Sequence, residues 1–116
     1  MSRYVPASAA RIEKNNSVRE VLSREGDDGT AIRHVRHYIY PLVLPSQRKD
    51  RIVARLASFG FAICDAAAHE GLILDHEREV ASADFDNLTE ALERITGAEN
   101  WEYDGWECAI VNTLPQ

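Results

Sequence analysis

The sequence predicts an α+β protein: a four-stranded antiparallel sheet, two crossover helices on one face of that sheet, and an extra helix before the first strand. Segments rich in β-branched and aromatic side chains alternate with segments whose apolar residues recur at helical spacing. After the first helix, the order is strand, helix, strand, strand, helix, strand. A chain of 116 residues, 45% of them hydrophobic and 28% charged, is typical of one compact globular domain.

The N-terminal part of the chain contains two segments of different character. Residues 1–16 show no apolar period, and we expect a flexible N-terminal arm there. Ser17 and Glu20 then form a capping box, in which each side chain accepts a backbone N–H at the start of a helix. Gly26 is expected to end this helix. Residues 17–116 are therefore expected to form the single folded domain.

The first strand and the first crossover helix follow this N-terminal helix. Residues 30–40 are rich in β-branched and aromatic side chains and predict the strand. Pro41 is expected to end it, and Ser46 is available to cap a helix over residues 47–59. In that helix the apolar positions follow helical spacing, and basic side chains occupy most of the other positions. Gly60 is expected to end the helix.

A hairpin and a second crossover helix come next. Residues 61–66 and 72–80 predict two strands, joined through a turn at residues 69–71. The helix that follows has Ser82 or Asp84 available as its N-cap and Gly97 as its expected end.

The end of the chain completes the predicted sheet. Asp104 and Gly105 are expected to turn the chain into a closing strand over residues 106–111. The resulting element order is that of the ferredoxin-like fold, βαββαβ, in which the sheet has strand order 4-1-3-2. Cys64 and Cys108 would then lie on opposite edge strands, roughly 14 Å apart and beyond disulfide reach. We therefore expect both to be buried free thiols in a reducing cytoplasm.

The charges are divided unevenly along the chain. The formal net charge is −6, but residues 1–60 carry +5 and residues 61–116 carry −11. The total argues against a uniformly basic nucleic-acid-binding protein. The division favours a bipolar interaction surface, basic on the first strand and first crossover helix and acidic on the segments that follow. No apolar stretch approaches the ~18 residues of a membrane span, so no membrane partner is expected.

One segment resembles a known family. Residues 102–107 contain the tetrapeptide Tyr-Asp-Gly-Trp, which resembles the signature of the regulator of ribonuclease E activity B family. Residues 33–38, with a His-Tyr pair after the Gly-Asp-Asp turn at residues 26–28, are similar to the matching region of that family, as is the helix over residues 84–97. The resemblance covers about residues 17–111.

This resemblance implies a ferredoxin-like fold and a bacterial, cytoplasmic protein that binds ribonuclease E. It also implies that the protein tunes the cleavage of RNA without chemistry of its own. The sequence departs from the best-known members in two ways. Those members carry a long acidic C-terminal tail, whereas this chain ends at Gln116, and this chain has an additional polar arm before Ser17.

The sequence contains no recognisable catalytic or cofactor site. The nucleophilic side chains lie in no elbow or triad pattern, and no Gly-rich phosphate loop occurs. His34 and His37 point to opposite faces of a strand, so they cannot chelate one ion together. Either one can approach His76, beside Asp75, if the first and third strands are neighbours, and a small metal-dependent enzyme is therefore a third hypothesis. We expect solvated strand histidines and no metal.

The expected protein-interaction surface combines aromatic and acidic side chains. The aromatic side chains near the closing strand either pack on the end of the sheet or stay partly exposed as contacts for a partner. The acids of the second crossover helix either form a solvated face that screens the basic helix or bind an arginine-rich segment of ribonuclease E. The expected site residues are Tyr103, Asp104, Gly105, Trp106, Glu107, Asp84, Asp86, Glu90 and Glu93.

Two functions from different classes are consistent with these patterns. The leading hypothesis is a non-catalytic regulator that binds ribonuclease E or a related RNA-degradation assembly, with its oligomeric state left open. The alternative is a single-stranded RNA-binding module that stacks bases on Tyr38 and Tyr40 of the first strand. Acidic side chains on the third strand repel phosphate and therefore disfavour this alternative. At most a weak contact with RNA is expected. These acids are Asp75, Glu77 and Glu79.

Overall fold

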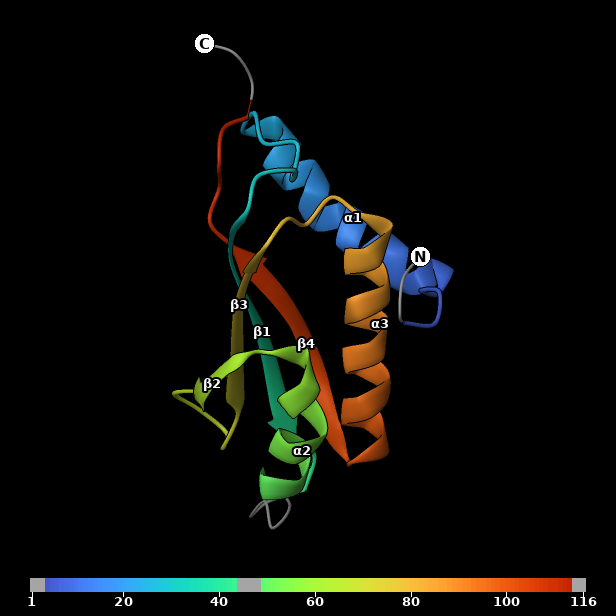
Figure 1. Cartoon of the computed structure of the whole chain (residues 1–116), viewed down its shortest axis with the longest axis vertical. Coiled ribbons are helices and arrows are strands. Elements are labelled where there is room, and N and C mark those ends of the chain that lie inside the picture. The colour runs from blue at the N-terminus through green and yellow to red at the C-terminus, as the bar shows by residue number, and fades with distance from the viewer. Residues whose placement is uncertain (1–3, 44–48, 114–116) are drawn as a thin grey trace. The chain divides into compact units, whose positions relative to one another are not determined.

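The computed structural model describes residues 4–43 and 49–113, which form helices and a four-stranded sheet (Figure 1). The expected α+β class and the N-terminal helix are both confirmed. Ser46, the expected cap of the first crossover helix, lies outside the described residues. The elements are α1 (Ala9–Arg24), β1 (Arg33–Pro41), α2 (Lys49–Leu56) followed by a 3₁₀ turn (Ala57–Phe59), β2 (Ala62–Asp65), β3 (Leu72–Arg78), α3 (Ala83–Ala98) and β4 (Trp101–Cys108).

The four strands form one antiparallel sheet with the order β2-β3-β1-β4. Read from the β4 edge, this order is 4-1-3-2. Cys64 on β2 and Cys108 on β4 therefore lie on opposite edge strands, and both are thiols. The expectation that they are buried is wrong, because Cys64 is exposed and Cys108 is half-buried. An edge strand has a neighbour on one side only, and it leaves its side chains more accessible to water.

The chain divides into two compact units. The first consists of Met1–Arg33, Glu77–Ala91 and Ala109–Gln116. The second consists of His34–His76 and Leu92–Cys108. Helix α3 contributes its first half to one unit and its second half to the other.

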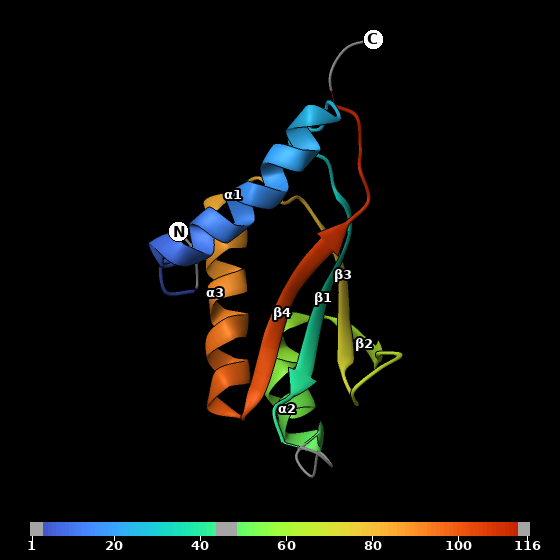
Figure 2. The ribbon, with the colours of Figure 1, turned by 180° about the vertical axis from the view of Figure 1, so that it is seen from behind.

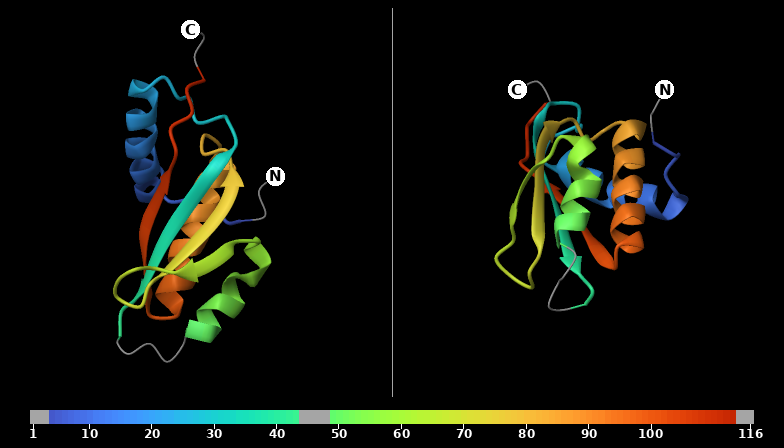
Figure 3. Two further views of the ribbon diagram at one scale, coloured as in Figure 1. Left: turned by 90° about the vertical axis from the view of Figure 1, so that its left-hand side faces the viewer. Right: turned by 60° about the horizontal axis from the view of Figure 1, so that its bottom comes forward.

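The second unit holds most of the sheet, with α2 and the end of α3 on one of its faces (Figure 3). Strand β1 alternates buried and more exposed residues, as a strand with one covered face must. On α2, Ile52 and Leu56 are four residues apart and fully buried, so they lie on one side of the helix. Gly60 ends this helical segment in a left-handed conformation, as expected. The buried hydrophobic side chains of this unit are Val35, Ile39, Ile52, Leu56, Leu72, Leu74, Leu92, Trp101 and Tyr103.

Helix α1 begins nine residues earlier than expected. Its N-cap is Ser8, whose Oγ accepts the backbone N–H of Arg11 at 3.2 Å. Ser17 does not cap the helix; it lies in its middle, where its hydroxyl donates to the carbonyl of Glu13 at 3.2 Å. Residues 9–16 are thus helical and do not belong to a flexible arm. The apolar pattern did not reveal them because polar side chains, Arg11 and Asn15, form the buried side of this part of the helix.

Helix α3 begins where the sequence predicted and ends later. Its cap is Ser82, whose Oγ accepts the backbone N–H of Phe85 at 3.1 Å. Gly97 does not end the helix, which continues to Ala98. The left-handed residue that follows the helix is Asn100, with φ 61°. Asparagine tolerates this conformation better than most residues, so the helix needs no glycine there.

A buried ion pair joins three segments of the first unit. The carboxylate of Asp27 accepts two hydrogen bonds from the Arg33 guanidinium, each 2.8 Å long. It also accepts the backbone N–H groups of Gly29 and Val111, both at 2.9 Å. Arg33 in turn donates to the carbonyl of Ala109 at 3.2 Å. The turn after α1, the start of β1 and the segment after β4 are therefore held together by one carboxylate.

These contacts lower the pKa of Asp27 to about 2, chiefly through the hydrogen bonds from Arg33. Burial acts in the opposite direction and is outweighed. The carboxylate therefore stays ionised throughout the ordinary pH range, and Arg33 keeps its counter-charge.

Replacing Asp27 by Asn should destabilise the protein strongly. The variant leaves the buried Arg33 guanidinium without a charged partner, and breaking a buried pair in this way costs about 3–5 kcal/mol. Urea unfolding measures the loss. Asp28→Asn is the matched control, because Asp28 is exposed and its side chain accepts hydrogen bonds from Thr30, not from a buried guanidinium. An equal loss in both variants would contradict the role assigned to Asp27.

The same pair predicts how stability depends on pH. A carboxyl group whose pKa is lowered in the folded state stabilises that state fully above its unfolded pKa, and the contribution is lost as the pH falls through the folded pKa. Asp27 changes from 3.8 to about 2 on folding. Wild-type protein should therefore lose about 2 kcal/mol between about pH 4 and pH 2 that Asp27→Asn does not lose. Urea midpoints measured across this range test the difference.

Candidate protein-interaction surface

Strand β4 runs through the Asp104-Gly105 pair without turning. Both residues lie opposite a single residue of β1, Tyr38, because the pairing register shifts at this point. Two residues against one is the pattern of a β-bulge. Gly105 has φ 103°, a conformation that side chains other than glycine rarely adopt. The expected turn at this pair is therefore wrong, since a bulge uses the same Asp-Gly pair as a turn. The expected closing strand is present, but it covers Trp101–Cys108 instead of residues 106–111.

The bulge decides which face of the sheet receives the neighbouring aromatic side chains. Tyr103 pairs with Ile39, and Trp106 pairs with His37. Directly opposed residues of an antiparallel pair point to the same face, and both partners on β1 are fully buried. In a regular strand Tyr103 and Trp106 would point to opposite faces. With the bulge, both are directed to the covered face: Tyr103 is buried and Trp106 is half-buried.

A histidine pair lies among these buried side chains. His37 has no exposed surface; its Nδ1 is 2.7 Å from the Tyr103 hydroxyl and its Nε2 is 2.9 Å from Nε2 of His76. The ring of Phe61 packs against both imidazoles, at centroid distances of 5.6 and 4.7 Å. The expectation of solvated strand histidines is wrong for His37, because it points inward with Val35 and Ile39. In residues 4–43 and 49–113, no group of three or more His, Cys, Asp or Glu side chains is placed to hold a metal ion.

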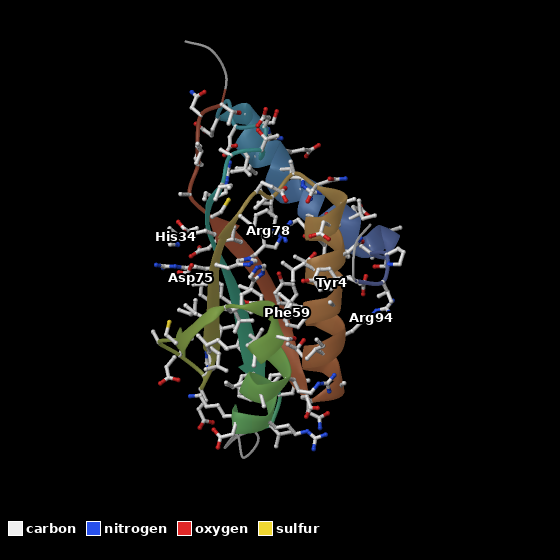
Figure 4. All side chains as sticks on the ribbon, viewed as in Figure 1. Tyr4, His34, Phe59, Asp75, Arg78 and Arg94 are labelled. Atoms are coloured by element: carbon white, nitrogen blue, oxygen red, sulfur yellow. The ribbon has the colours of Figure 1, made fainter. Side chains whose placement is uncertain are left out.

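His34 lies on the other face of β1, as its spacing from His37 predicted. It is exposed, and its Nδ1 is 3.1 Å from the carboxylate of Asp75 (Figure 4). The same carboxylate is 3.5 Å from Nε of Arg36. These contacts connect β1 with β3 on the face of the sheet that α2 does not cover.

Most charges on this uncovered face are negative. The pairs Arg36–Glu107 and Tyr40–Glu102 join β1 to β4 there. The Tyr38 hydroxyl donates to Glu107 at 2.5 Å, and this bond raises the pKa of the phenol. We call this surface the outer face; it consists of His34, Arg36, Tyr38, Tyr40, Asp75, Glu102, Asp104 and Glu107, and all eight side chains are exposed or half-buried.

The acidic residues expected on the second crossover helix do not form one open surface. Asp86 and Glu90 are buried, because helix α1 lies over them. Asp86 accepts hydrogen bonds from Arg19 at 2.8 Å and from Asn15 at 2.9 Å. Glu90 accepts the backbone N–H of Ser8 at 2.8 Å. In this structure both carboxylates bind the protein's own N-terminal helix.

The other two acids of α3 are more accessible. Glu93 is exposed, and Asp84 is half-buried, 3.4 Å from the guanidinium of Arg78. The basic side chains of α2 pair elsewhere: Arg51 and Arg55 bind Glu99 at 2.7 and 2.8 Å.

The sequence prediction missed Glu99. The Glu99 side chain is almost fully buried, and the hydrogen bond from Arg55 is the main cause of its lowered pKa. The spacing of Arg51 and Arg55, four residues apart on one side of α2, was the available signal for a shared acidic partner. The hypothesis that acidic groups screen the basic helix α2 therefore applies to Glu99 and not to the acids of α3.

Residues 12–108 match the family model described as Regulator of ribonuclease activity B. The chain belongs to this family. The matched part begins in the first turn of α1 and ends with β4, so it includes the bulge and the outer face. A comparison with curated proteins gave no match. Among the described residues, no helix is long and apolar enough to cross a membrane.

The role of the bulge can be tested at Gly105. Gly105→Ala should destabilise the protein by about 1–2 kcal/mol, because an added Cβ strains the backbone at positive φ. Gly97→Ala is the matched control, since a Cβ would meet nothing within 4 Å at either position. In helix α3 this change should stabilise by about 0.5–1 kcal/mol. Urea unfolding compares the two, and equal stability of the two variants would contradict the bulge.

Proposed function

We propose that this protein regulates ribonuclease E, or a related RNA-degradation assembly, by binding it without catalysing a reaction itself. Membership of the regulator of ribonuclease activity B family supports the regulation of a ribonuclease. We choose the outer face as the binding surface because acidic side chains and two tyrosines are accessible there. We also propose that the sheet and its two crossover helices are a ferredoxin-like domain, and that the protein acts in the bacterial cytoplasm.

The outer face has the chemistry of a contact for a basic protein segment. Asp75, Glu102, Asp104 and Glu107 carry four negative charges, against one permanent positive charge on Arg36. Complementary charge raises the association rate and selects the partner. Tyrosine supplies a large contact area at a low cost in conformational entropy, which is why it is frequent in interface cores. An arginine-rich segment of the ribonuclease is therefore the expected partner.

The structural roles of the outer face also support a binding function over a catalytic one. The carboxylate of Glu107 accepts from Tyr38, and Asp75 lies between His34 and Arg36. Neither carboxylate is placed beside a buried nucleophile, which general-base catalysis would require.

RNA binding is the alternative, and one observation favours it. Tyr38 and Tyr40 alternate along the central strand β1 on the uncovered face, where RNA-binding sheets stack bases. The paired strands work against it, because Glu102, Glu107 and Asp75 place negative charge beside both tyrosines, and phosphate is repelled. We therefore rank protein binding first.

Charge reversal on the outer face tests the proposal. Glu102→Lys with Glu107→Lys should weaken binding to purified ribonuclease E about ten-fold or more at low salt. Glu20→Lys with Glu25→Lys is the matched control, because it changes the net charge equally at exposed positions of the α1 end. Calorimetry measures the affinities, and circular dichroism verifies the fold of each variant.

Two outcomes would overturn this assignment. If wild-type protein does not bind ribonuclease E at low salt, the partner is wrong. If it instead binds single-stranded RNA with micromolar, salt-sensitive affinity, the RNA-binding alternative replaces it.

A further inference from the structure

Helix α1 lies across the first half of α3 (Figure 2), and polar groups join the two helices. Arg11, Asn15 and Arg19 recur every four residues, so they lie along one side of α1. Asn15 donates to Asp86 and to Thr89, both at 2.9 Å. The remaining contacts of this polar seam are Arg19 with Asp86, Val80 and Ser82, the backbone N–H of Ser8 with Glu90, and the backbone N–H of Ala7 with Asn87.

The seam contains almost no buried apolar surface on the α1 side. Leu22, in the last turn, is the one apolar side chain of α1 that is buried. Ile12 is 37% exposed and Val21 is 51% exposed. Hydrogen bonds made on folding replace hydrogen bonds to water, so each contributes little net stability. A segment held in this way belongs to the parts of a protein that open locally before the whole molecule unfolds.

The two ends of α1 are held with different strength. At its C-terminal end, Leu22 is buried and its carbonyl accepts the backbone N–H of Asp27, which the Arg33 pair fixes. At its N-terminal end, the contacts of Ala7 and Ser8 are hydrogen bonds from their backbone N–H groups to side-chain oxygens of Asn87 and Glu90. Opening is therefore expected to start at Ser8 and to stop before Leu22.

We propose that residues 8–20, the N-cap Ser8 and the first turns of α1, are an autoinhibitory strap, which occupies the carboxylates of Asp86 and Glu90 until a cationic segment of the partner displaces it. The partner part of this inference rests on the function proposed above. The structure shows what the covered carboxylates accept: the guanidinium of Arg19 on Asp86, and the backbone N–H of Ser8 on Glu90. An arginine-rich segment offers the same groups and competes with the strap for them.

Displacement exposes these two carboxylates on α3. Asp86 and Glu90 are four residues apart in the sequence. Residues three or four apart on a helix are neighbours on its surface. The opened strap thus uncovers an adjacent acidic pair on α3, which the closed strap keeps from a partner.

Amide hydrogen exchange on the full chain tests the strap directly. Arg19→Met removes the ion pair of the seam, whereas Lys14→Met removes a cation from an exposed position of the same helix. We expect exchange in residues 9–20 to become about five- to ten-fold faster in Arg19→Met and to be unchanged in Lys14→Met. If residues 9–20 of the wild type exchange only as slowly as the buried strands, and Arg19→Met leaves them so, the strap is wrong.

A peptide competition separates this inference from the proposed function. A short arginine-rich peptide, added to wild-type protein, should accelerate exchange in residues 9–20, and a glutamate-rich peptide of the same length should not. No acceleration by the arginine-rich peptide would overturn the autoinhibitory role. Failure to bind ribonuclease E would instead overturn the proposed partner, while the peptide result would still decide whether the strap yields to cationic segments.

Discussion

The β-bulge at Asp104 and Gly105 is the constraint on which the second unit depends. By placing two residues of β4 opposite one residue of β1, it directs both Tyr103 and Trp106 to the covered face. Tyr103 then reaches His37, and Glu107 remains on the outer face, where it binds Tyr38. Slipping the register by one residue would exchange core and surface side chains along the rest of the strand. The contact between the buried His37 and Tyr103, and the position of Glu107 on the outer face, both follow from this one irregularity.

Polar contacts join separate segments of the first unit, beside its buried apolar side chains. Asp27 and Arg33 hold three separate segments through one buried pair, and a polar stripe on α1 binds polar partners on α3. Such contacts depend on the ionisation of their carboxylates and on salt, because charged groups are screened and protonated while methyl groups are not. The stability of the first unit is therefore expected to depend on pH and salt concentration.

The charge division along the sequence has a more specific meaning in the structure than a bipolar surface. Three groups of acids within residues 61–116 have different roles. Glu99 pairs with two arginines of α2, Asp86 and Glu90 hold α1, and the acids of the outer face remain accessible. Of these three groups, only the last forms an open acidic surface, and it lies on the sheet, whereas the sequence placed half of the expected site on a helix. Charge counts locate acidic segments but not the face to which each side chain points.

The sequence by itself determined the element order, the α+β class and the family, because these depend on local periodicity and a short signature. It did not determine the start of α1, the course of the chain at Asp104-Gly105 or the burial of His37. Each of these is decided by a partner distant in the chain: the polar side of α3, the register of β1, and the hydroxyl of Tyr103. A polar side chain has the same local signal whether it meets water or a buried partner, and only tertiary structure distinguishes the two.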